Sequence, residues 1–236
     1  MSINRPFTKE NLDLCLKELG KEFRRLNGTK TRADIILIGG AAILANYSFR
    51  EMTYDIDAVI LASSAMKEAA DHVGDKLGLQ PGWLNMDFQR TKSFSDKLSE
   101  VSVCYKTFSN ILTIRSVSAE YLIAMKLMSG RQYKNDLSDI VGILLEHKKM
   151  GTPITKNMID TAIDRLYKNH SQLPLSSQKF LSDIFINGDY EDIYNKIREN
   201  EIQSKNILLD FERDYPDTLK EENIESILEQ AKRKRK

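Results

Sequence analysis

The sequence predicts an α/β (α+β) protein, in which a core with a small mixed sheet flanked by helices precedes an all-helical carboxy-terminal region. In the first half of the chain, apolar β-branched runs alternate with segments of helical periodicity, as expected where helices cover a sheet. From Ser118 onward the pattern is almost wholly helical. We therefore expect a core over residues 1–117 and a helical region over residues 118–236 that packs on it.

Four segments have the composition of strands. The run from Ala33 to Ile38 is apolar and β-branched, which is typical of a strand buried on both faces, and Gly39-Gly40 end it. Two later runs are separated only by Ser109-Asn110, a connection short enough for a hairpin. The predicted strands span residues 33–38, 53–61, 101–108 and 111–115.

The helices are predicted from apolar residues at helical spacing and from the residues that start and stop them. Thr8 is a good capping residue and Gly28 a common stop, so the first helix lies between them. The other predicted helices span residues 41–46, 63–77, 118–129, 135–147, 155–168, 176–186 and 190–198.

The composition is that of a folded protein, with 41% hydrophobic and 29% charged residues. Lysine and arginine (35) nearly balance aspartate and glutamate (34), so the net charge does not favour binding to nucleic acid or a membrane surface. No apolar run is long enough to span a bilayer, and we expect a cytoplasmic protein that does not bind membranes. Cys15 and Cys104 lack the spacing of a zinc or redox motif and are expected to be buried thiols.

Asp55 and Asp57 are the first residues that suggest chemistry. Because strand side chains alternate, both would project from one face of the predicted strand 53–61, where the two carboxylates can reach one cation. Two like charges repel and strands disfavour aspartate, so the pair costs stability unless a metal or a basic partner neutralises it. We predict that Asp55 and Asp57 bind Mg²⁺ or Mn²⁺; the alternative is a pair of exposed charges at a strand edge.

Gly39 and Gly40 stand where an apolar strand ends and a helix begins. Glycine lets a phosphate approach the backbone closely, and the free amides at a helix start face the anion. Together with the acidic pair, this turn indicates phosphoryl transfer, in which magnesium neutralises a nucleoside triphosphate and aligns an attacking hydroxyl with its α-phosphorus. By itself, a Gly-Gly pair is more often only a tight turn.

Ile38-Gly39-Gly40 followed by Asp55-Ile56-Asp57 resembles the signature of the DNA polymerase β-like nucleotidyltransferase superfamily. Arg50 and Thr53, with the two aspartates, resemble the Arg-x-x-Thr-x-Asp-x-Asp form of a branch that includes abortive-infection type nucleotidyltransferase toxins and bacterial relatives. The resemblance implies an enzyme that transfers a nucleoside monophosphate from a nucleoside triphosphate to a hydroxyl of RNA, protein or a small molecule. It also implies a toxin–antitoxin role with an antitoxin or another cognate partner protein.

A later helix is similar to that branch through Lys126, Arg131, Asp136 and Asp139. The resemblance assigns catalysis and metal binding to Asp55 and Asp57. It implies that Arg131, Asp136 and Asp139 support the site without binding the metal themselves. It assigns nucleotide binding to Gly39, Gly40, Arg50, Thr53 and Lys126. Lys126 is the only charge in an apolar stretch, and three roles remain open: it reaches solvent, pairs with Asp136 or Asp139, or contacts a phosphate.

Superfamily enzymes usually carry a third carboxylate on a later strand, and the two predicted hairpin strands contain none. Either Glu100, Asp136 or Asp139 substitutes for it, or two carboxylates suffice. In the third alternative the protein is a catalytically silent binding or regulatory module that keeps the nucleotidyltransferase fold.

Overall fold

The computed structural model of the protein describes residues 6–131, 134–220 and 222–234. The chain divides into two compact units, Met1–Met125 with Asn157–His170 and Lys126–Lys156 with Ser171–Lys236. The strands of the described chain all lie in the first unit, and helices make up the second. The predicted fold class, a mixed sheet with flanking helices followed by carboxy-terminal helices, is confirmed.

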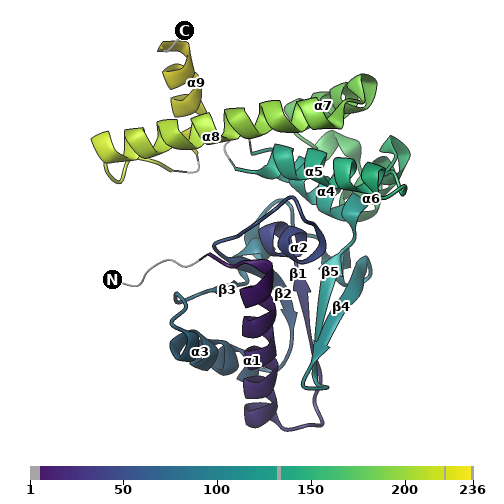
Figure 1. Cartoon of the computed structure of the whole chain (residues 1–236), viewed down its shortest axis with the longest axis vertical. Coiled ribbons are helices and arrows are strands. Elements are labelled where there is room, and N and C mark those ends of the chain that lie inside the picture. The colour runs from purple at the N-terminus through teal and green to yellow at the C-terminus, as the bar shows by residue number, and fades with distance from the viewer. Residues whose placement is uncertain (1–5, 132–133, 221, 235–236) are drawn as a thin grey trace. The chain divides into compact units, whose positions relative to one another are not determined.

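The sheet has five strands in the order β3-β2-β1-β5-β4 (Figure 1). The central strand β1 pairs antiparallel with β2 and parallel with β5, while β3 adds parallel to β2 and β4 antiparallel to β5. The strand bounds are Ala33–Leu37 (β1), Ile56–Leu61 (β2), Leu84–Asn85 (β3), Ser102–Phe108 (β4) and Leu112–Val117 (β5).

The central strand is almost entirely buried, as its apolar composition predicts. Ile35, Ile36 and Leu37 have no exposed surface. The hairpin between β4 and β5 turns at Ser109 and Asn110, which both adopt a left-handed conformation with φ of 53° and 57°. Such a turn matches the twist of the strands it joins, and asparagine tolerates it better than most residues.

Helices α1 (Lys9–Asn27) and α3 (Ala65–Leu77) pack side by side against the sheet in the first unit (Figure 1). One stripe of α1 is buried without exposed surface, and it consists of Leu12, Leu16, Leu19 and Phe23. Gly20 lets this helix approach the sheet closely, because a Cβ atom there would lie 2.8 Å from the Cβ of Phe108. As predicted, α1 begins after Thr8 and ends before Gly28.

Two more helices complete the first unit. Helix α2 (Gly39–Asn46) follows β1 directly. Helix α6 (Lys156–Tyr167) returns to this unit from much later in the chain. It is anchored by Tyr167, whose hydroxyl donates to the Ser93 carbonyl at 2.7 Å, and by the Ser95 hydroxyl, which donates to the Leu166 carbonyl at 3.0 Å.

The second unit is built from the end of α4 and from four further helices. Helix α4 (Ala119–Ser129) runs from one unit into the other. The other helices of this unit are α5 (Asp136–Lys149), α7 (Leu175–Asn187), α8 (Tyr190–Asp214) and α9 (Ile224–Lys234). Short 3-10 turns, Asp87–Arg90 (η1), Asp96–Ser99 (η2) and His170–Gln172 (η3), complete the described secondary structure.

Several sequence-based boundaries are wrong. The second strand begins at Ile56 and not at residue 53, because Thr53 pairs instead with Phe7 in an isolated bridge. The helix predicted over 41–46 already begins at Gly39, and α8 continues to Asp214 where we expected an end near residue 198. No glycine or proline interrupts α8 after Arg198, so its polar composition there did not mark an end.

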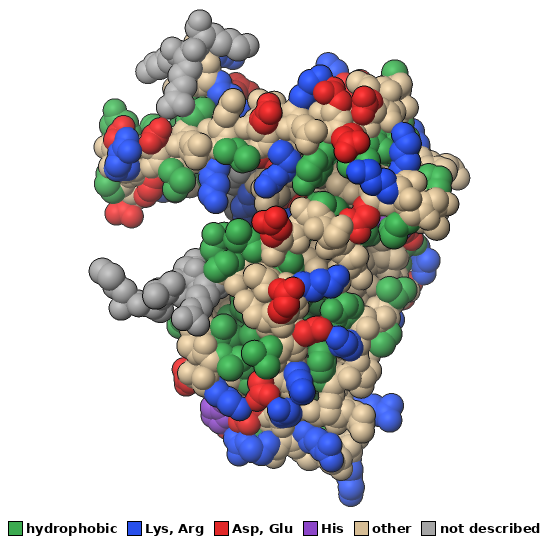
Figure 2. Space-filling view, viewed as in Figure 1, with side chains coloured by type: hydrophobic (Ala, Val, Ile, Leu, Met, Phe, Trp, Pro, Cys, Tyr) green, Lys and Arg blue, Asp and Glu red, His purple; other side chains and the backbone are tan. Residues whose placement is uncertain are grey.

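The surface of the described residues agrees with the balanced composition. In the face drawn in Figure 2, basic and acidic side chains are interspersed, with apolar side chains between them. No helix in the described part of the chain has the length and hydrophobicity that a membrane crossing requires. Cys15 is buried as expected, but Cys104 is exposed on the edge strand β4, so that expectation is wrong for Cys104.

Candidate active site

The glycine turn lies directly beside the carboxylate of Asp57. Gly39 has a φ of +55°, and a Cβ atom added to it would lie 3.2 Å from Asp57 Oδ2. The backbone amide of Ile38, just before the turn, donates to the Asp57 carbonyl at 3.1 Å. The antiparallel pairing of β1 with β2 therefore brings together two motifs that are far apart in the sequence.

Gly40 faces Arg50 and Thr53, two of the residues to which the resemblance assigned nucleotide binding. A Cβ atom at Gly40 would lie 2.7 Å from the hydroxyl oxygen of Thr53 and 2.8 Å from a guanidinium nitrogen of Arg50. Only a glycine lets these side chains come so close to the backbone at the start of α2. Arg50 in turn donates from Nε to the carbonyl of Met52 at 3.2 Å.

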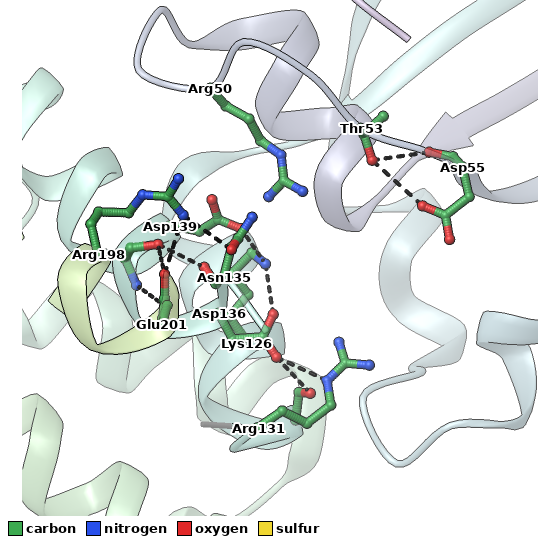
Figure 3. Close-up of polar contacts among 12 residues, drawn as sticks. Arg50, Thr53, Asp55, Lys126, Arg131, Asn135, Asp136, Asp139, Arg198 and Glu201 are labelled. Atoms are coloured by element: carbon green, nitrogen blue, oxygen red, sulfur yellow. Dashed lines mark hydrogen bonds and ion pairs between the residues drawn. The ribbon is translucent and has the colours of Figure 1, made fainter. Parts of the chain in front are cut away.

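Asp55 precedes the second strand and is exposed, whereas Asp57 lies within it and is half-buried. The hydroxyl of Thr53 donates to the Asp55 carbonyl at 3.2 Å and lies 3.5 Å from its carboxylate (Figure 3). Thr53 is itself fixed by two backbone hydrogen bonds to Phe7, at 2.6 and 2.9 Å. The buried Ile56 separates the two aspartates and holds this segment on the sheet.

Asn85 is a residue of this site to which the sequence analysis assigned no role. It lies on the two-residue strand β3, where it pairs in register with Asp57, and its Nδ2 donates to Asp57 Oδ1 at 3.4 Å. A strand this short has no detectable periodicity. The available signal was one polar residue between the apolar Leu84 and Met86, just after the turn at Pro81-Gly82.

The oxygen donors of this site have the chemistry of a magnesium site. Asp55 and Asp57 supply carboxylates, which are hard ligands suited to Mg²⁺ or Mn²⁺. Among residues 6–131, 134–220 and 222–234, no three histidine, cysteine, aspartate or glutamate side chains are placed so that together they could hold a metal ion. Glu100, one of the candidates for a third carboxylate, lies 3.4 Å from the guanidinium of Arg165.

The other predicted residues form a cluster in the second unit, in which Lys126, Asp136 and Asp139 are buried and Arg131 is half-buried. Lys126 Nζ lies 2.8 Å from Asp136 Oδ1 and 2.7 Å from Asp139 Oδ2 (Figure 3). Arg131 Nε and the Ser129 hydroxyl reach the second oxygen of Asp136, at 3.0 and 2.9 Å. Of the three roles left open for Lys126, the structure contains the ion pair, and exposure to solvent is excluded because only 7% of Lys126 is accessible.

The charges of this cluster are balanced, since two cations meet two carboxylates. Burial alone would raise the pKa of Asp136, but Lys126 and Arg131 outweigh it and hold this pKa below its ordinary value. A neighbouring buried carboxylate, Glu201 of α8, accepts hydrogen bonds from the Ser138 amide and hydroxyl at 3.1 and 2.6 Å. Burial raises the pKa of Glu201 despite these bonds.

A mixed sheet whose central strand ends in a glycine turn beside an acidic strand is the arrangement expected of a protein of the nucleotidyltransferase class. The chain belongs to the family described as nucleotidyltransferase of unknown function (DUF6036), whose model matches residues 15–198. That match includes the glycine turn, both aspartates and the Lys126 cluster. Searches of curated proteins and of solved structures found no match to this chain.

Proposed function

We propose that the protein is a Mg²⁺-dependent nucleotidyltransferase that transfers a nucleoside monophosphate from a nucleoside triphosphate to a hydroxyl group. The observation that carries this proposal is the position of Asp57 Oδ2, 3.2 Å from where a Gly39 side chain would begin. A phosphate seated on the glycine turn and a cation held by the carboxylate would then be neighbours. Membership of a nucleotidyltransferase family supports the same reaction class.

Five residues of the first unit have defined roles in this proposal. The backbone of Gly39 and Gly40, at the start of α2, binds the phosphates, and Arg50 supplies a positive charge close to Gly40. Asp55 and Asp57 would hold Mg²⁺, and the ion would supply positive charge to neutralise the triphosphate. The acceptor oxygen then bonds to the α-phosphorus as the bond to the pyrophosphate oxygen breaks, and the hydroxyl proton is released.

Lys126, Arg131, Asp136 and Asp139 have a structural role in this proposal, because their charges neutralise one another inside the second unit. A direct contact of Lys126 with a nucleotide phosphate is the second proposal for this residue. It requires at least one of the two carboxylates to give up the ammonium, which costs free energy in a buried cluster.

Labelling with α-radiolabelled nucleoside triphosphates tests the reaction. Asp57→Asn should abolish transfer of the label to an acceptor, with Mg²⁺ or Mn²⁺ present, while the thermal unfolding temperature stays close to that of the wild type. Asp34→Asn is the matched control, since Asp34 lies at the opposite end of β1 and pairs there with Leu61. Undiminished labelling by Asp57→Asn would exclude the proposed role of this carboxylate.

The acceptor is proposed to be RNA, a protein or a small molecule, and supplying each class separately in the labelling assay distinguishes them. A toxin–antitoxin role in the cytoplasm, with an antitoxin as partner, follows from the resemblance of the Arg50 to Asp57 segment. Expression of the wild type should then arrest growth, and expression of Asp57→Asn should not.

A catalytically silent binding module is the alternative function. The observation that favours it is the amide of Asn85 beside Asp57, where an additional carboxylate would strengthen metal binding. Calorimetry separates the two functions. Triphosphate binding that requires Mg²⁺ supports the enzyme, and the absence of binding with and without metal supports the silent module.

A further inference from the structure

The contact between Asn85 and Asp57 joins the edge strand of the sheet to the acidic strand. Both residues are half-buried, and the parallel pairing of β3 with β2 sets them opposite each other. Trp83, just before β3, also fixes this strand against β2. It is buried, and its carbonyl accepts a hydrogen bond from the Ile56 amide at 3.0 Å. Asn85 is therefore held against Asp57 by the sheet itself and not by a mobile side chain alone.

Hydrogen bonding determines which way the Asn85 amide points. The backbone N–H of Asp87 lies 2.7 Å from Asn85 Oδ1. A backbone N–H can only donate, so the atom that faces it must be the amide oxygen. The NH₂ group then points at Asp57, with Nδ2 3.4 Å from Oδ1. The amide thus acts as a donor to the carboxylate.

The two oxygens of Asp57 have different surroundings as a result. Oδ1 accepts a hydrogen bond from Asn85, while Oδ2 lies 3.2 Å from the position that a Cβ atom on Gly39 would occupy. A carboxylate held at one oxygen keeps a fixed orientation, and hydrogen bonds to metal ligands commonly serve this purpose. Oδ2 therefore faces the position at which the proposed phosphate would sit.

We infer that Asn85 is a positioning residue for metal binding, which orients the Asp57 carboxylate towards the glycine turn and keeps the cation site at two negative charges. This inference rests on the proposed function. A site with two carboxylates binds a divalent cation weakly by itself and gains affinity from the charge of the triphosphate. Metal binding should then depend strongly on the nucleotide.

Asn85→Asp tests the inference by changing the charge without changing the shape. The aspartate retains an oxygen that can accept from Asp87 N–H, but it cannot donate to Asp57 at neutral pH. Without metal, the two carboxylates repel, and with metal, both attract the cation. Gln89→Glu is the matched control, because it adds the same charge by the same change at an exposed position of η1.

The measurements are Mn²⁺ titration of the full chain by calorimetry, without nucleotide, and thermal unfolding with and without Mn²⁺. We expect Asn85→Asp to bind Mn²⁺ roughly tenfold more tightly than the wild type and to unfold at a lower temperature when metal is absent. Asn85→Ala should bind roughly tenfold more weakly because Asp57 loses a hydrogen bond that orients its carboxylate. Gln89→Glu should change Mn²⁺ affinity by less than about twofold.

The Mn²⁺ affinity of Asp57→Asn separates failure of the role of Asn85 from failure of the metal site itself. If Asp57→Asn loses Mn²⁺ binding while both Asn85 variants bind like the wild type, the role of Asn85 is refuted and the proposed function stands. If Asp57→Asn binds Mn²⁺ like the wild type, the metal site itself is refuted, and the proposed function with it. Opposite shifts in the two Asn85 variants support the inference, since a purely structural role of Asn85 would not tighten metal binding in either.

Discussion

The ammonium of Lys126 lies 2.7 Å from Asp139 Oδ2, and both side chains are more than nine-tenths buried. Lys126 comes from α4 and Asp139 from the first turn of α5, so the pair ties together two helices that follow one another in the chain. Asp136 also pairs with Lys126, at 2.8 Å, and links it to Arg131 in the same cluster.

Replacement of Lys126 by methionine should therefore be strongly destabilising. It keeps the apolar length of the side chain but leaves two buried carboxylates without their shared cation, which costs about 3–5 kcal/mol of unfolding free energy. Urea denaturation measures the change. If Lys126→Met unfolds like the wild type but loses nucleotide binding, the phosphate contact is the correct role for Lys126.

The pH dependence of stability should contain the contribution of Asp136. Its pKa in the folded protein lies below the ordinary value of 3.8, so the unfolded chain takes up the proton first as the pH falls. The stabilisation is therefore complete above about pH 4 and is lost progressively below it. Asp136→Asn should flatten the acid limb of a stability–pH curve, whereas Asp183→Asn, at an exposed position of α7, should leave that limb unchanged.

Substitution of the turn glycines should weaken nucleotide binding. Gly40→Ala places a methyl group 2.7 Å from the Thr53 hydroxyl and 2.8 Å from Arg50, so both side chains have to move. We expect a loss of affinity for Mg²⁺-triphosphate of roughly tenfold or more, measured by calorimetry, because the backbone can no longer approach the phosphates.

Gly28→Ala is the control for this experiment. It also introduces a side chain into the same unit, at a φ of +73°, but finds no heavy atom within 4 Å. Some stability should be lost, on the order of 1 kcal/mol, with no change in nucleotide affinity. Equal effects of the two substitutions on affinity would contradict a phosphate-binding role of the turn.

The two thiols should differ in reactivity. Burial raises the pKa of Cys15 to about 11, so little thiolate forms at neutral pH, while Cys104 is exposed on β4. Ellman's reagent should modify Cys104 within minutes in the folded protein and Cys15 only after denaturation. Cys104→Ser should remove the rapid phase, and a rapid phase that persists would mean that Cys15 is accessible.

Much of the fold could be predicted because its signals are local. The apolar run of β1, the stop at Gly28 and the hairpin at Ser109-Asn110 depend on residues within a few positions of one another. The strand β3 could not be predicted in this way. Two residues have no periodicity, and they become a strand only because β2 offers an unpaired edge.

The features of the candidate site also fall into two groups, those that local sequence patterns predict and those that depend on tertiary contacts. The sequence by itself determined the acidic pair, the glycine turn and the class of chemistry they suit, because spacing along one strand and one turn is enough to define each. Only the tertiary structure decided that Gly39 lies beside Asp57, that Asn85 donates to Asp57, and that Lys126 is paired with Asp136 and Asp139. These contacts depend on strand register and helix packing, which join residues that no local pattern relates.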